Sequence, residues 1–174
     1  RPLSRGLGDV YKRQDMAMAD KDDDPATDPF TLMEGKTSCH TSALGSSGML
    51  LPMGYLITNE YIEVVGDPDE IDSLENTVRN YFSEDSSIPE SGTKYHRYIG
   101  SLRCLAEGGM DYISFAKDPT VPSYCGNEDP DDNEDWCFEG EFTSVDDYYA
   151  LPTFGKAPSL SLIHISEPTR QWSI

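Results

Sequence analysis

Helix and strand patterns alternate along the middle of the chain, and this alternation constrains the fold more than any other feature. The segment YIEVV (61–65) has the β-branched composition of a strand, and DPDEIDSLENTVRNYF (67–82) predicts a helix. A second helix is predicted over YIGSLRCLAEGG (98–109), where glycines end it, and a second strand over DYISFAK (111–117). Such alternation predicts an α/β domain.

The predicted helix 67–82 carries its own start signals and a clear apolar face. Asp67 suits the N-cap, Pro68 the first turn and Glu70 the third position. The apolar residues recur at helical spacing and are expected in the core: Ile71, Leu74, Val78, Tyr81 and Phe82.

A Ser/Gly-rich turn leads into an apolar run in CHTSALGSSGMLLPMGYLI (39–57), which predicts the opening of a short helix. The free N–H groups of a helix start can bind an anion together with nearby hydroxyls, here those of Thr41, Ser46 and Ser47. Ser/Gly turns are common, so this pattern alone is weak evidence for a site.

The chain is strongly acidic, with a formal net charge of −19. Residues 1–14 carry +3 and residues 160–174 carry 0, so residues 15–159 carry −22. Such a surface repels nucleic acid and anionic membranes, and both are excluded as partners. It is compatible with a saline environment, with cation binding, or with solubility alone.

Four cysteines, Cys39, Cys104, Cys125 and Cys137, fit two disulfides with three possible pairings. No CxxC occurs, which disfavours zinc knuckles and thioredoxin-like chemistry. The even number favours an oxidising, extracellular compartment. Cys125 and Cys137 bracket eleven residues, a suitable length for a local disulfide, which leaves Cys39 to pair with Cys104.

The two ends look foreign to the domain. Residues 1–14 and 160–174 lack helical and strand periodicity, and the strings GDVYKRQ and LIHISEPTR resemble translated sequencing-adapter read-through. Both ends are therefore excluded from the predicted fold, which leaves residues 15–159. The alternative is a genuine basic tail. No apolar run has the length of a membrane span, and any signal peptide lies outside this sequence.

Five blocks resemble a lobe of the transferrin family in their order and spacing: SCHTS, PMGYL, SLENTVRNYF, YIGSLRCLAEGGMDYISFAKDPTV and VDDYYALPTFGKAPS. The resemblance covers most of residues 15–159 and corresponds to the second subdomain of a lobe. It implies a periplasmic-binding-protein-like α/β subdomain with a mixed sheet flanked by helices. The acidity and the few cysteines suggest the algal, phytotransferrin-like branch.

The resemblance implies transport of ferric iron with a synergistic carbonate, in an extracellular or cell-surface protein. Anionic oxygen ligands suit Fe³⁺, a hard ion, and a phenol ligates as phenolate because the ion favours its charged form. Tyr98 takes the place of a tyrosine ligand. Thr41 takes the place of the anion-binding threonine, and Ser47 and Gly48 supply helix-end N–H groups. Cys39–Cys104 matches a disulfide of the family.

The chain also departs from the family pattern. Gly45 replaces the anion-site arginine, so carbonate is expected to bind more weakly or to be held by Ser46 and Ser47. No second tyrosine stands before MAMADK (16–21), and Leu160 stands where a histidine is expected. The aspartate ligand belongs to a first subdomain that is absent. A cysteine that the family has near residue 150 is missing here, and Cys125 is expected to replace it as the partner of Cys137.

Other readings remain open. One is an iron-free, transferrin-like binding or adhesion module, favoured by Gly45; another is an anion-binding receptor domain. No order of residues typical of a catalytic triad emerges, so an enzyme is not expected. His40 and His96 are assigned core or surface roles rather than ligation. A membrane anchor or receptor, like the first subdomain, would lie outside this fragment, and one ligand alone would not hold iron tightly.

Overall fold

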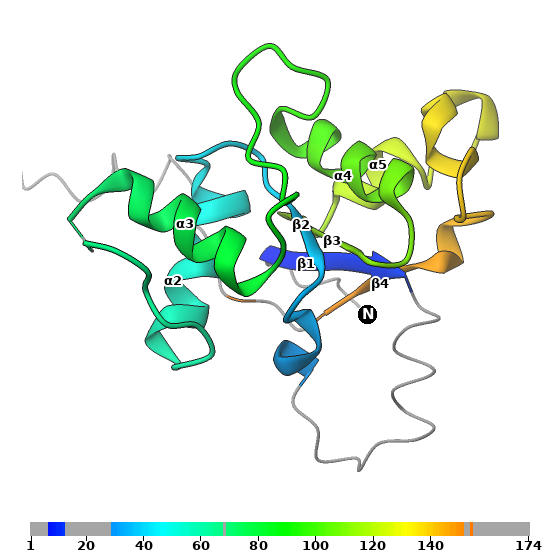
Figure 1. The fold of residues 1–174 in the computed structure, drawn as a ribbon. Helices are drawn as coiled ribbons and strands as arrows, with labels where there is room; N and C mark the ends of the chain where they lie inside the picture. Colours follow the sequence, from blue (N-terminus) through cyan, green and yellow to red (C-terminus); the bar gives the residue numbers. More distant parts are fainter. Residues whose placement is uncertain (1–6, 13–28, 68, 152–153, 155–174) are drawn as a thin grey trace, which may run out of the picture.

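The protein, seen in a computed structural model that describes residues 7–12, 29–67, 69–151 and 154, is built on one mixed sheet (Figure 1). Its strands are β1 (Leu7–Lys12), β2 (Thr37–Cys39), β3 (Tyr112–Lys117) and β4 (Tyr148–Ala150), in the order β2-β3-β1-β4. Strands β2 and β3 run parallel, whereas β1 is antiparallel to both β3 and β4. The predicted mixed sheet is confirmed.

Helices lie on both sides of these strands, α2 and α3 on one side and α4 and α5 on the other (Figure 1). The longer helices are α2 (Leu51–Thr58), α3 (Ile71–Tyr81) and α4 (Arg97–Gly108). The shorter helical segments are η1 (Pro29–Met33), η2 (Ser46–Leu50), α5 (Thr120–Tyr124), η3 (Pro130–Asp132), η4 (Asp135–Phe138) and η5 (Val145–Asp147). The predicted helix at 98–109, the strand at 111–117 and the helical opening after the Ser/Gly turn are all present.

The presence of strand β1 differs from the sequence-based prediction, which leaves residues 1–14 out of the fold. Leu7–Lys12 instead fills the position between β3 and β4, with Val10 opposite both Ser114 and Ala150. Backbone groups make these pairings, so a proline-free segment can supply a strand without alternating side chains. The foreign origin of residues 1–14 stays a prediction, and residues 160–174 lie outside the described part.

Two predictions on the α3 side were wrong. Residues 61–65 form no strand, and the outer edge of β2 instead carries a single parallel bridge from Cys39 to Ser87. Helix α3 begins at Ile71 rather than beside Asp67. The Asp67 carboxylate accepts the Asp69 N–H at 3.0 Å, and this local turn competes with helix formation.

The buried apolar side chains form two clusters. The first core comprises Phe30, Met33, Met49, Met53, Leu56, Ile62, Val78, Phe82, Ile113, Phe115 and Leu151. The second core comprises Leu102, Leu105, Ala106, Val121, Cys125, Trp136, Cys137 and Phe142. Strand β3 gives Ile113 and Phe115 to the first core, while the hydroxyl of Ser114 bonds that of Ser101 on α4 at 2.7 Å. Both faces of β3 are therefore covered. This is typical of strands in parallel pairs, such as β2 and β3, which are usually buried on both faces.

Candidate anion and metal site

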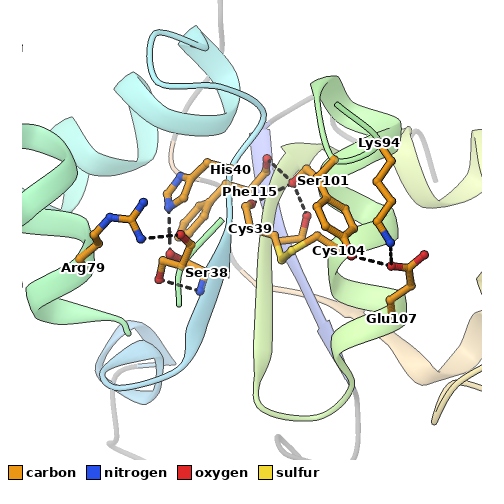
Figure 2. Close-up of a disulfide and its surroundings, with 12 residues drawn as sticks. Ser38, Cys39, His40, Arg79, Lys94, Ser101, Cys104, Glu107 and Phe115 are labelled. Atoms are coloured by element: carbon orange, nitrogen blue, oxygen red, sulfur yellow. Dashed lines mark hydrogen bonds and ion pairs between the residues drawn. A yellow bond between two sulfur atoms is a disulfide. The ribbon is translucent and has the colours of Figure 1, made fainter. Parts of the chain in front are cut away.

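The disulfide Cys39–Cys104 joins the end of β2 to the middle of α4, with its Cα atoms 6.0 Å apart (Figure 2). The Ser101 hydroxyl supports the same junction by donating to the Cys39 carbonyl at 2.9 Å. Cys125 and Cys137 form the second disulfide, so both predicted pairings are present. The turn that follows Cys39 is thereby held against the start of α4.

The backbone of Thr41 and the backbone just before Tyr98 meet at this junction. The N–H of Arg97 donates to the Thr41 carbonyl at 2.9 Å, and Tyr98 is the next residue in the first turn of α4. Arg97 makes this contact with a left-handed backbone (φ 67°), which is uncommon for a residue other than glycine. Tyr98 is half-buried, and the ammonium of Lys117, at the end of β3, lies 4.7 Å from its ring centroid.

The start of η2 presents a row of free N–H groups. Gly45 is extended, and its carbonyl accepts the N–H groups of Met49 and Leu50 at 2.8 and 3.0 Å. The N–H groups of Ser46, Ser47 and Gly48 precede these bonds and have no acceptor within the described part of the chain. N–H groups at a helix start carry partial positive charge and bind anions.

Two buried hydroxyls adjoin these N–H groups. The side chain of Thr41 packs so closely on the helix start that a Cβ at Gly45 or Gly48 would overlap its Oγ1. Thr41 is 5% exposed and Ser47 4%, and neither hydroxyl has a partner among the described residues. A buried polar group without a partner costs about 1–3 kcal/mol, so this arrangement suits a bound acceptor. We call these hydroxyls and the N–H groups of Ser46, Ser47 and Gly48 the anion cradle.

The same geometry shows what an arginine at position 45 would meet. Thr41 Oγ1 occupies the space in which a side chain at Gly45 would begin. A larger residue at Gly45 therefore requires Thr41 to move. Ser46 is exposed, so its hydroxyl faces solvent, while Ser47 and Gly48 are buried.

His40 is fully buried, in agreement with the predicted core role, and lies next to Ser38 and Phe115 (Figure 2). Its Nδ1 donates to the Gly48 carbonyl at 2.8 Å, and its Nε2 lies 2.9 Å from the Ser38 hydroxyl. The ring stacks on Phe115 with centroids 4.9 Å apart. Burial lowers the pKa of His40 to about 4, helped by the charge of Arg79 and opposed by the bond to Gly48. His40 is therefore neutral at physiological pH.

The structure brings the predicted residues Thr41, Ser46, Ser47 and Gly48 together at one helix start. Tyr98 is connected to this group through the backbone bond between its neighbour Arg97 and Thr41. Within residues 7–12, 29–67, 69–151 and 154, no group of three or more His, Cys, Asp or Glu side chains is placed to hold a metal ion. The positions expected for a second tyrosine and a histidine, before MAMADK and at Leu160, lie outside those residues. None of the described helices has the length and apolar character needed to cross a bilayer.

Comparison with known proteins agrees with this architecture. Residues 26–93 match the family described as Transferrin. Lactotransferrin of Camelus dromedarius is 30% identical over 149 residues, which cover 78% of this chain and 20% of that protein. The chain belongs to the transferrin family. Human lactotransferrin is 32% identical over 114 residues, 60% of this chain and 16% of that protein.

The solved structure of transferrin 1 from Manduca sexta has the same fold, with a TM-score of 0.61 at 17% identity. That alignment covers 91% of this transferrin-family chain and 27% of the insect protein. The predicted periplasmic-binding-protein-like α/β class is thereby confirmed. The chain spans about a fifth of the length of the curated transferrins it matches.

Proposed function

We propose that this chain is the second subdomain of a lobe of an iron-transporting transferrin, spanning residues 15–159, and that it takes ferric iron as cargo together with carbonate. One observation carries the proposal. Tyr98 directly follows the residue whose N–H binds Thr41, and the hydroxyl of Thr41 is buried at a helix start with free N–H groups. The backbone that carries the proposed phenolate ligand is thus bonded to the backbone of the anion cradle.

The anion cradle suits carbonate by its donor set. The hydroxyls of Thr41 and Ser47 and the N–H groups of Ser46, Ser47 and Gly48 can all donate, and carbonate only accepts. The helix start adds favourable charge for a dianion. The chain as a whole, at −19, repels anions, so binding depends on these local donors.

Tyr98 is the proposed iron ligand within this chain. A phenolate oxygen suits the hard ferric ion, and the remaining ligands would come from segments outside the described residues and from a first subdomain. The chain alone is therefore expected to bind iron weakly. A gene with a tyrosine just before residue 16 and a histidine just after Ser159 would support this assignment, with residues 1–14 and 160–174 as foreign segments.

The setting proposed for the whole protein is the extracellular space or the cell surface. Two disulfides support an oxidising compartment. Any membrane anchor or receptor would be provided elsewhere in the protein. The acidic composition is the basis for proposing the algal, phytotransferrin-like branch. The family relationship is the basis for proposing a carrier role rather than catalysis.

A second candidate is an iron-free module that binds or adheres, or an anion receptor of the same architecture. Gly45 favours it, because Thr41 Oγ1 fills the place where an anion-binding arginine would start. Such a protein would keep the anion cradle and lose the need for Tyr98 as a ligand.

The test is the visible tyrosinate-to-iron absorption band of the full-length protein with Fe³⁺ and bicarbonate. We expect the band in the wild type, its loss or strong reduction in Tyr98→Phe, and no change in Tyr95→Phe. Tyr95 is a matched control, because its hydroxyl bonds Glu107 at 2.7 Å, outside the cradle. No band in the wild type would refute iron binding, and carbonate binding without a band would favour the second candidate.

A further inference from the structure

We propose that His40 is a positioning residue of the anion cradle, which holds the start of η2 through the bond from Nδ1 to the Gly48 carbonyl. This inference rests on the proposed carbonate binding and adds a residue that touches neither carbonate nor iron. The bond, at 2.8 Å, holds the carbonyl of the Gly48–Met49 peptide, whose N–H donates to Gly45. This peptide is joined through the Gly48 Cα to the peptide that carries the free Gly48 N–H, so its orientation limits the direction of that N–H. His40 also precedes Thr41 in the chain, so one ring is tied to both halves of the cradle.

The ring can do this because it is fixed from every side. Phe115 of β3 stacks on it at 4.9 Å, and Phe82, just after α3, meets it edge-on at 6.2 Å. Ser38 of β2 holds the opposite nitrogen at 2.9 Å (Figure 2). A fully buried ring with both nitrogens bonded has one favourable orientation, so the Gly48 carbonyl is held in one place.

The bonding pattern also assigns the tautomer. A carbonyl only accepts, so Nδ1 carries the proton. In the neutral ring Nε2 then accepts from the Ser38 hydroxyl. The charged group that acts on the ring is the guanidinium of Arg79 on α3, which donates to the Ser86 carbonyl at 3.1 Å and disfavours a second positive charge nearby. β2, β3 and η2 meet the ring with Ser38, Phe115 and Gly48, none of which is charged.

A pair of substitutions separates positioning from packing. In His40→Asn the amide nitrogen can take the place of Nδ1 and donate to the Gly48 carbonyl, whereas in His40→Gln it extends toward the place of Nε2, beside Ser38. Both variants lose the stacked ring, so a merely structural role affects them equally. We expect bicarbonate affinity, measured by calorimetry on the whole chain, to stay within about threefold of wild type in His40→Asn and to fall about tenfold in His40→Gln.

Nuclear magnetic resonance of the wild type gives a second readout that needs no variant to fold. We expect ¹⁵N shifts of a ring protonated at Nδ1, and a shift of the Nδ1–H resonance when bicarbonate is added, because hydrogen bonds in series polarise one another. Equal affinities in the two variants, or a ring protonated at Nε2, would overturn the role of His40.

The two proposals fail differently. If bicarbonate moves no amide resonance of the wild type, the proposed anion binding is wrong. The positioning claim then still stands or falls on the anion-free spectra, in which the Ser46, Ser47 and Gly48 amides should match wild type in His40→Asn and move in His40→Gln. Unchanged amides in His40→Gln would overturn it.

Discussion

Cys39–Cys104 and Cys125–Cys137 join partners 65 and 12 residues apart, and they serve different parts of the molecule. The first ties β2 to α4 beside the anion cradle, where the contributing segments are distant in sequence. The second closes a loop within the second core, under exposed acidic residues. The long-range crosslink therefore lies where the proposed site depends on it, and the local crosslink lies elsewhere.

The acidic loop bracketed by Cys125 and Cys137 and the anion cradle also differ in whether their polar groups have hydrogen-bond partners. In the acidic loop, Asp129 accepts the Asp131 N–H at 3.1 Å, and Asn133 accepts the Asn127 N–H at 2.9 Å. In the anion cradle, the buried hydroxyls of Thr41 and Ser47 have no such partners among the described residues. Polar composition is shared, but the loop groups named here bond within the loop, whereas the two cradle hydroxyls bond to no described residue.

The largest expected difference comes from removing each disulfide. Because the chain-entropy contribution grows with loop length, Cys39→Ala/Cys104→Ala should lose about 4 kcal/mol of unfolding free energy and Cys125→Ala/Cys137→Ala about 3 kcal/mol. Urea unfolding measures both. Only the first pair should also abolish bicarbonate binding; equal effects on binding would contradict the contrast between the regions.

Gly100 gives the next largest effect. A Cβ there would overlap the backbone carbonyl of Tyr95, so Gly100→Ala should cost about 3 kcal/mol, near the upper range for overpacking. Gly54→Ala is the control, since Gly54 is exposed on α2 with nothing near its Cβ, and helix propensity should stabilise that variant by up to about 1 kcal/mol. If Gly100→Ala unfolds at the same urea concentration as wild type, the packing of α4 described above is wrong.

The pH dependence of the free energy of unfolding tests whether His40 is buried as a neutral ring. Its pKa is lowered to about 4 from an unfolded value near 6.5, so its stabilisation is full above about pH 6.5 and is lost as pH falls toward 4. The free energy of unfolding of the wild type should fall by about 2 kcal/mol between neutral pH and about pH 5. Urea unfolding measures it, with His40→Asn, which lacks the imidazole, as the reference.

Glu107 provides the contrast on the other side of the sheet. Hydrogen bonds from Lys94, Tyr95 and Arg103 outweigh desolvation and lower its pKa to about 2. Its contribution is present above about pH 4.5 and is lost below that value, so it changes little at about pH 5, where the His40 effect is measured. A wild type as stable at about pH 5 as at neutral pH, relative to His40→Asn, would contradict the buried neutral ring.

These contrasts show how much the sequence could predict. Helix α4, strand β3 and the disulfide Cys125–Cys137 follow from periodicity, glycine stops and loop length, which are local signals. Cys39–Cys104 follows only as the remaining pair. The apolar stripe of α3 was also predictable, and Val78 and Phe82 lie in the first core.

The rest depends on tertiary contacts. Residues 61–65 have strand composition, but a strand also needs a pairing partner, and composition does not say whether the tertiary fold supplies one. Thr41 and Ser47 were named from the sequence, whereas the burial of their hydroxyls without partners depends on how the turn packs against η2. The contact of His40 with Gly48 has no sequence signal, since it joins a strand end to a helix start eight residues away.

The smallest expected effect concerns the backbone next to Tyr98. Arg97 and Glu60 have similar left-handed φ values, 67° and 63°, so Arg97→Gly and Glu60→Gly should each stabilise by about 1 kcal/mol. Thermal unfolding measures both. A loss of stability in Arg97→Gly alone would show that the Arg97 side chain contributes contacts that the backbone argument omits.

The central claim is that the anion cradle binds carbonate, and amide resonances during a bicarbonate titration test it most directly. We expect the amides of Ser46, Ser47 and Gly48 to shift, those of residues 127–134 to stay in place, and Thr41→Val to weaken binding about tenfold. Thr120→Val, at another buried threonine, should bind as wild type does. Shifts in the acidic loop instead of the cradle, or full affinity in Thr41→Val, would contradict the account.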